Sequence, residues 1–346
     1  MNEKKDMKIE LLRVLSCILV IIIHVVSKNF FNININTLNW NYLNIFDSLS
    51  RCSVPIFFMI TGAFILKKDI NTKTLFKKYI KKYFLIFIIW KLLYGFYYWS
   101  SSHTLTLKTL LSLLLYSFKN LGHLWYLVSL LIIYLLYPYI KIIIKKLNSK
   151  SWRYTNIIFL LIIIIYSIYI INVKEIPETI KNIELFGYII YFILGYYIYN
   201  IKKKDNKTLK YLLPAIISII ITVILTKYST LYYNKPIEKY YSYFFITTYI
   251  ESIMIFNLFI NCNIINKISN KLKKIINTVS KNTLNIYIIH VFVIDVIFAL
   301  IGLKELSNLL TIPIYTLLTF LISIIISLIF KFLIYTYKIL TERSIS

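Results

Sequence analysis

The chain has 346 residues, 59% of which are hydrophobic, and its formal net charge is +26 at pH 7. Soluble globular domains are roughly 45–50% apolar, so this composition excludes an ordinary soluble protein. The positive charge does not indicate a nucleic-acid partner, because the basic residues are dispersed in short clusters between long apolar runs.

Apolar segments close to the ~20 residues needed to cross a bilayer recur from end to end. The ten predicted spans are 9–27, 45–66, 83–100, 123–144, 154–172, 183–201, 209–227, 243–260, 282–302 and 311–336. No segment between them is long enough for a soluble domain. We therefore predict an all-α, polytopic membrane protein with about ten transmembrane helices, forming a single domain over residues 1–346. The three cysteines show neither disulfide nor metal spacing, so no metal site is expected.

Lysine and arginine are distributed unevenly between the two sides of these spans. Six alternating segments (the N-terminus, 67–82, 141–153, 201–210, 261–281 and the tail from 331) hold 28 basic residues, and the intervening segments hold nine. Because cytoplasmic loops are enriched in Lys and Arg, both termini are predicted to be cytoplasmic. The basic, amphipathic segment 67–84 then lies along the inner membrane surface, either as an anchor to lipid headgroups or as a contact for an anionic soluble cofactor.

The first span, within "ELLRVLSCILVIIIHV", carries two side chains that are costly in hydrocarbon. Arg13 and His24 are eleven residues apart, which is three helical turns, so both lie on one helix face with a rise of about 16 Å between them. Arg13 is either a topology anchor or a planar fork that grips phosphate or carboxylate. His24 is either an interfacial histidine or a general base for a hydroxyl nucleophile.

The second span repeats this spacing with Arg51 and Gly62 in "RCSVPIFFMITG". Arg51 enters from the outer side and is expected near the depth of His24. Pro55 removes one backbone hydrogen bond from the span, and Gly62 favours close helix packing.

Later spans contribute further polar and aromatic candidates. Trp125 and Tyr126, beside His123 in "GHLWYL", form either an aromatic belt or part of a site. Glu251 lies well inside the predicted eighth span, where it needs a partner or a proton. Tyr287 and His290 lie in the ninth span, within "TLNIYIIHVFVID".

Taken together, these segments resemble the membrane acyltransferase-3 family, and most closely its enterobacterial-common-antigen O-acetyltransferase branch. The matching pieces, in the family's order, are "ELLRVLSCILVIIIHV", "SLSRCSVPIFFMITGAFIL", "HLWYL", "YFILGYYI" and "LNIYIIHVFVI". Arg13 and His24 fall on the family's arginine and histidine in the first span, and Arg51 and Gly62 fall on its second pair. Thr61 stands where the family commonly has serine, and the chain resembles the branch that is expected to work without the hydrolase-like domain of larger members.

The resemblance implies a multi-pass enzyme of the bacterial plasma membrane that moves an acyl group, usually acetyl from acetyl-CoA, to a hydroxyl of a surface glycan or its lipid-linked precursor. Acyl-CoA is then a donor substrate, and no permanently bound cofactor is implied. His24 is the expected base, Arg51 or Tyr126 would stabilise the oxyanion, and Arg13 would hold the donor. The alternatives are a transporter or flippase for a lipid-linked or acylated sugar, and a module for small-molecule uptake. The acceptor, the acyl chain and the oligomeric state are left open.

Overall fold

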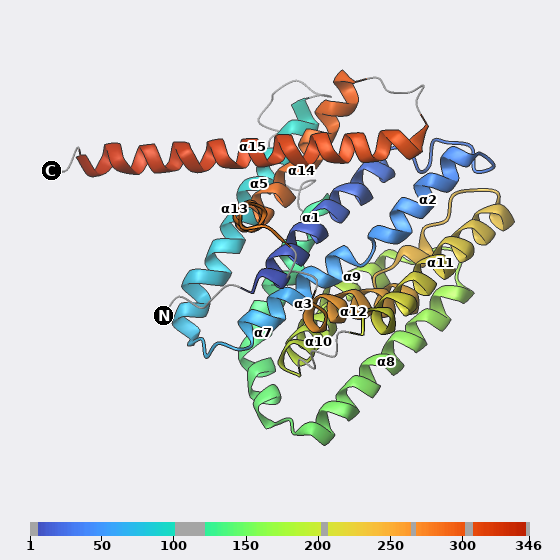
Figure 1. The fold of residues 1–346 in the computed structure, drawn as a ribbon, viewed down its shortest axis with the longest axis horizontal. Helices are drawn as coiled ribbons and strands as arrows, with labels where there is room; N and C mark the ends of the chain where they lie inside the picture. Colours follow the sequence, from blue (N-terminus) through green and yellow to red (C-terminus); the bar gives the residue numbers. More distant parts are fainter. Residues whose placement is uncertain (1–5, 101–121, 202–206, 264–267, 302–306, 344–346) are drawn as a thin grey trace.

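A computed structural model describes residues 6–100, 122–201, 207–263, 268–301 and 307–343, and all regular structure in these ranges is helical. The elements are α1 (Met7–Ser27), α2 (Leu38–Ser50), α3 (Ser53–Ile65), α4 (Thr72–Thr74), the π-helix η1 (Leu75–Ile80), α5 (Lys81–Ser100), the 3-10 helix η2 (Gly122–Leu124), α7 (Trp125–Lys146), α8 (Ser149–Asn172), α9 (Glu178–Gly187), α10 (Ile189–Asn200), α11 (Thr208–Tyr233), the 3-10 helix η3 (Lys239–Tyr241), α12 (Ile246–Asn261), α13 (Asn270–Ser280), α14 (Thr283–Leu300) and α15 (Asn308–Arg343). The prediction of an all-α, polytopic membrane protein is confirmed (Figure 1).

Within the described ranges, eight helical segments are long and apolar enough to cross a membrane. They are Met7–Ser27, Leu38–Ile65, Gly122–Lys146, Ser149–Asn172, Thr208–Tyr233, Lys239–Asn261, Thr283–Leu300 and Asn308–Leu333. The predicted span 83–100 corresponds to α5, where Lys91 and several Tyr and Trp residues lower the hydropathy. The predicted span 183–201 is interrupted at Tyr188, between α9 and α10. The count of ten and the cytoplasmic placement of both termini stay predictions.

The predicted span 45–66 is two helices, α2 and α3, with a break at Arg51 and Cys52. The cause lies in the sequence. Pro55 has no N–H to donate to the carbonyl of Arg51, four residues earlier, and proline is accommodated most easily in the first turn of a helix. The chain therefore restarts at Ser53, which places Pro55 in the first turn of α3 and Arg51 as the C-terminal cap of α2.

Helix α1 lies in the middle of the bundle, packed against α2, α3, α12, α13, α14 and α15 (Figure 1). It begins at Asp6, whose carboxylate accepts a hydrogen bond from the backbone N–H of Lys8, as expected of an N-cap. Its apolar residues contribute to two hydrophobic clusters, Ile9, Leu12 and Val20 to one and Val14, Cys17, Ile21, Val25 and Val26 to the other. The polar residues of α1 therefore lie where these two hydrophobic clusters meet.

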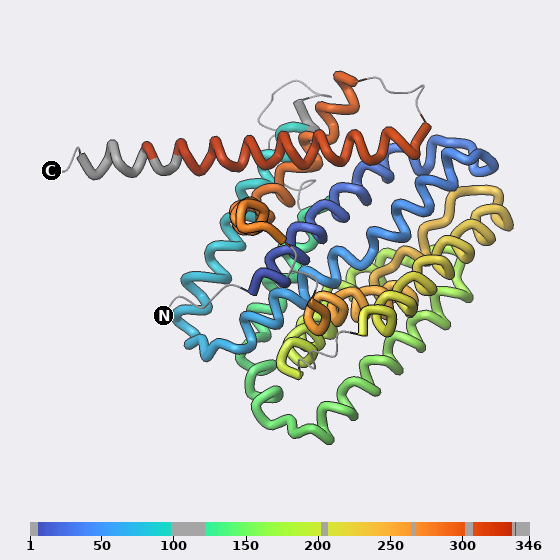
Figure 2. Tube along the Cα trace, in the orientation of Figure 1, coloured from blue at the N-terminus to red at the C-terminus, as the bar shows by residue number. Residues whose placement is uncertain are grey.

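The backbones of α3 and α10 approach each other closely. A Cβ atom added at Gly62 would lie 1.7 Å from the carbonyl oxygen of Phe192, and one added at Gly195 would lie 2.0 Å from that of Met59. Two glycines facing in this way let helix backbones touch, as small residues commonly do in membranes. By contrast, α8 lies at the edge of the bundle, away from α1 (Figure 2), and its apolar side chains are mostly exposed, as expected for a helix facing lipid.

Candidate active site

A cavity of about 840 Å³ lies beside the C-terminal end of α1. We call it the Arg51 cavity. Its lining includes His24 and Arg51, together with Trp125 from α7 and Tyr188 between α9 and α10. The chain segment that follows α11 supplies much of the rest: Lys235, Pro236, Ile237, Glu238, Lys239, Tyr241, Ser242 and Tyr243. On the predicted topology this cavity lies toward the outer side of the membrane.

Arg51 is held at the cavity by two neighbours. Its guanidinium donates to the carboxylate of Asp47, one turn earlier in α2, and lies over the ring of Tyr241, 4.5 Å from its centre. The Arg51 side chain keeps 14% of its exposure, whereas Asp47 keeps only 3%. Sequence reasoning missed Asp47, although its i,i+4 spacing to Arg51 is the ordinary signal for such a pair.

A second cavity, about 370 Å³, lies beside the other end of α1. We call it the Arg13 cavity. Three basic residues, Arg13, Lys82 and Lys281, line it together with an aromatic floor that includes Tyr126 and Tyr287. Lys82 belongs to the basic segment 67–84, so this segment contributes a cation to the cavity. Three cations around one small cavity suit a polyanionic ligand.

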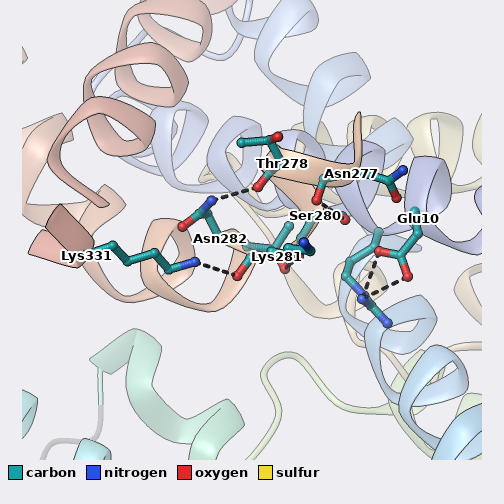
Figure 3. A network of polar contacts seen from close by, with 9 residues as sticks. Glu10, Asn277, Thr278, Ser280, Lys281, Asn282 and Lys331 are labelled. Carbon is teal, nitrogen blue, oxygen red and sulfur yellow. Dashed lines mark hydrogen bonds and ion pairs between the residues drawn. The ribbon is translucent and has the colours of Figure 1, made fainter. Parts of the chain in front are cut away.

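The turn between α13 and α14 forms one wall of the Arg13 cavity, close to Glu10 (Figure 3). Glu10 is buried, and one of its oxygens lies 3.1 Å from a guanidinium nitrogen of Arg13, in an i,i+3 ion pair. Ser280 and Asn282 fix the turn by donating to the backbone carbonyls of Asn277 and Thr278. The ion pair aims the guanidinium while leaving other N–H groups for a ligand.

Three histidines from three separate elements meet between the two cavities. The ring centres of His24 and His290 are 4.8 Å apart, those of His123 and His290 are 5.4 Å apart, and those of His24 and His123 are 6.1 Å apart. His290 is completely buried, His123 nearly so, and His24 is half-buried where it reaches the Arg51 cavity. Sequence reasoning treated the three separately, because nothing local in the chain indicates that α1, η2 and α14 converge.

A run of aromatic rings links the histidines to the Arg13 cavity. Tyr126 and Tyr287 both line that cavity, with ring centres 5.2 Å apart. The Tyr287 ring in turn lies 5.6 Å from that of His290, and its hydroxyl donates to the backbone carbonyl of His123. The path from Tyr126 through Tyr287 and His290 to His24 therefore connects one cavity with the other.

The remaining sequence candidates, Trp125 and Glu251, are not members of the histidine cluster. Trp125 lines the Arg51 cavity, where its ring packs against Tyr188 and Tyr243 at 5.1 and 5.8 Å. Glu251 of α12 is buried but lines neither cavity. The structure therefore brings His24, Arg51 and Trp125 to one cavity and Arg13, Tyr126 and Tyr287 to the other, and leaves Glu251 outside both.

Within the described part of the chain, no group of three His, Cys, Asp or Glu side chains has an arrangement that could hold a metal ion. The rings of the three histidines contact one another. Their arrangement suits proton transfer, because imidazole titrates near neutral pH and can both donate and accept.

The rim of the Arg51 cavity carries exposed charges that tie two outer segments together. Lys235 donates to the carboxylate of Glu175, and this hydrogen bond together with the lysine charge lowers the pKa of Glu175 below its usual range. Lys28, just past the end of α1, forms an ion pair with Asp295 of α14. These pairs join α1 to α14 and the 173–177 segment to the segment after α11.

The family model of the acyltransferase-3 family, described as an acyltransferase domain, matches residues 7–328. No curated protein and no solved structure matches the chain. The match extends from the first helix to α15 and includes both cavities and all three histidines. The chain therefore belongs to the acyltransferase-3 family and is a membrane acyltransferase.

Proposed function

We propose that this membrane acyltransferase transfers an acyl group, most simply acetyl, from cytoplasmic acyl-CoA to a hydroxyl of a cell-surface glycan or its lipid-linked precursor, in the bacterial plasma membrane. One observation carries the proposal: two cavities of different chemistry lie beside opposite ends of α1, and aromatic and histidine rings link them. Such a layout suits a donor that arrives from one side and an acceptor that arrives from the other.

The donor is assigned to the Arg13 cavity. Coenzyme A carries several phosphate charges, and Arg13, Lys82 and Lys281 offer complementary charge there. Arginine adds a planar fork that can form two parallel hydrogen bonds to a phosphate. The rise of about 16 Å from Arg13 to His24 is spanned by the pantetheine arm, which carries the thioester toward the histidines.

The acceptor is assigned to the Arg51 cavity. At about 840 Å³ it is large enough for a sugar residue and part of a neighbour, and its lining mixes aromatic rings, an asparagine and charges of both signs. Trp125 and Tyr188 offer ring surfaces of the kind that contact sugar C–H groups. His24 lies at the edge of this cavity, within reach of a hydroxyl that enters it.

The chemistry follows from His24 as a general base. Its unprotonated nitrogen removes the proton from the acceptor hydroxyl while the hydroxyl oxygen attacks the thioester carbon. The tetrahedral intermediate collapses as the carbon–sulfur bond breaks, which leaves an ester on the acceptor and a thiolate on CoA. The imidazolium of His24 returns its proton to that sulfur. Arg51, in the same cavity as His24, or Tyr126, beside the Arg13 cavity, donates to the oxyanion.

The direct test is the His24→Ala variant, with His24→Gln beside it, assayed for acyl transfer at equal membrane abundance. Both are expected to be inactive, since a positioned general base contributes roughly 10²–10⁴-fold. Ser27→Ala is the matched control: it lies one turn later on α1, and its hydroxyl bonds only the backbone carbonyl of His24. Activity of either His24 variant above about a tenth of wild type would contradict the general-base role.

Two measurements address the rest of the proposal. Purified protein in detergent should consume acetyl-CoA in the presence of acceptor with no membrane gradient, which a transporter or flippase would not do. In mass spectra, surface glycans from a deletion strain should lack one acyl group that wild-type glycans carry. An unchanged glycan profile would exclude a glycan acceptor.

A further inference from the structure

The backbone around the histidine cluster fixes the proton positions of two of its three rings. Nε2 of His123 lies 3.2 Å from the carbonyl oxygen of Ile288, and Nδ1 of His290 contacts the carbonyl oxygen of Tyr287. A carbonyl oxygen can only accept, so both of these nitrogens carry hydrogen. In the neutral rings the other nitrogen, Nδ1 of His123 and Nε2 of His290, is therefore a lone-pair acceptor.

Nε2 of His290 is a buried acceptor with no hydrogen-bond partner among the described residues. Such an atom is costly to bury, so a hydrogen-bond donor is expected to bind to it. The nearest candidate is His24, whose ring centre lies 4.8 Å away at an interplanar angle of 62°. That separation matches two imidazoles joined by an N–H···N hydrogen bond of about 3 Å, after a rotation of the half-buried His24 ring.

We propose that His290 is a positioning residue for His24: its Nε2 accepts the ring N–H of His24, which fixes the tautomer of His24 and presents its second nitrogen, unprotonated, to the acceptor hydroxyl in the Arg51 cavity. This inference rests on the proposed function, in which His24 is the base. It assigns to a buried histidine the role that a carboxylate or carbonyl often plays behind a catalytic imidazole.

The surroundings of His24 explain why a neutral partner is useful. Two cations face it, Arg51 from the end of α2 and Lys28 from just past the end of α1, and both oppose the imidazolium that forms when His24 takes the proton. Each cation has its own carboxylate, Asp47 for Arg51 and Asp295 for Lys28. A neutral acceptor on α14 therefore stabilises the imidazolium without adding a charge to the buried cluster.

His123 is less suited to this role, even though it is part of the cluster. Its ring centre is 6.1 Å from that of His24, beyond a direct hydrogen bond, and Lys91 of α5 faces it. Its Nε2–H is committed to Ile288, and the hydroxyl of Tyr94 donates to the same carbonyl at 2.7 Å. His123 thus belongs to the wall that holds α14 in place, and His290 is the member whose acceptor nitrogen is buried without a partner among the described residues.

The test compares three variants in purified full-length protein at matched folded yield. His290→Met fills a similar volume without an acceptor, and His290→Gln places an amide oxygen near the position of Nε2. Ser323→Ala is the control, because it removes a buried polar group without a partner from α15, away from both cavities. Each is measured for kcat, for KM of acetyl-CoA and for the pH dependence of kcat.

For His290→Met we expect kcat to fall at least tenfold with KM little changed, and the acidic limb of the pH profile to move to lower pH, because the imidazolium of His24 loses its acceptor. For His290→Gln we expect kcat within a few-fold of wild type and an unmoved limb, and Ser323→Ala should match wild type. Equal losses in the Met and Gln variants with an unmoved limb would overturn the positioning role. So would wild-type activity in His290→Met.

The outcome of this test is separable from that of the proposed function. An inactive His24→Ala beside a fully active His290→Met would refute the positioning role alone, whereas an active His24→Ala would refute the base assignment itself. Should His290→Met fail to fold, His290→Leu and His290→Gln form the same comparison, of an apolar side chain against an acceptor.

Discussion

Substitution of Gly62 by alanine tests the packing that holds the Arg13 cavity together. The new Cβ would lie 1.7 Å from the carbonyl oxygen and 2.6 Å from the carbonyl carbon of Phe192, both backbone atoms that cannot rotate away. Real Cβ contacts essentially never fall below 3.0 Å, so α3 and α10 would have to separate by at least 1.3 Å. Overpacking of this kind costs about 1–3 kcal/mol, and the rigid neighbour places Gly62→Ala at the upper end.

The assay is thermal unfolding of detergent-purified protein, followed by acyl transfer by the fraction that remains folded. We expect a melting temperature several degrees below wild type, and reduced transfer as well, because α3 also carries Phe57 and Thr61 of the Arg13 cavity. Gly195→Ala should behave alike, since its Cβ would meet Met59 from the other side. Ile165→Ala, on the exposed face of α8, is the control. An unshifted melting temperature for Gly62→Ala would show that the two helices are not in backbone contact.

Three further substitutions probe the charged groups. Arg13→Lys keeps the charge but loses the fork, so the affinity for acyl-CoA should fall severalfold; identical titration curves would reduce Arg13 to an anchor. Asp47→Asn leaves the guanidinium of Arg51 without its carboxylate and should lower the free energy of unfolding by about 3 kcal/mol, while an unchanged unfolding transition would mean that Arg51 does not depend on this pair. Glu175 has a lowered pKa beside Lys235, so its ion pair stabilises the fold above pH 4.5 and is lost as the pH falls below that value. When melting temperatures are measured over a pH series, Glu175→Gln should remove this part of the acid sensitivity. Because both partners are exposed, added salt should reduce the difference in melting temperature between wild type and variant. A variant whose melting temperature depends on pH as steeply as that of wild type would contradict the ion pair.

The membrane class, the helical fold and the family could all be predicted from the sequence alone. These follow from local properties: apolar runs of bilayer length, charge between them and short motifs in order. The placement of Arg13 and His24 at opposite ends of one face of α1 is likewise a property of a single helix. The pairing of Asp47 with Arg51 is equally local, because the i,i+4 spacing of the two residues can be recognised in the sequence.

Tertiary structure decided everything that depends on which helices meet. Ring contacts among His24, His123 and His290 require α1, η2 and α14 to converge, and no periodicity in any one of them encodes that meeting. The exclusion of Glu251 from both cavities also follows from how neighbouring helices pack, whereas the break at Arg51 is local and follows from Pro55. Helix formation is governed by hydrogen bonds four residues apart, whereas a site between helices is governed by contacts across the whole chain, and those exist only once the bundle has assembled.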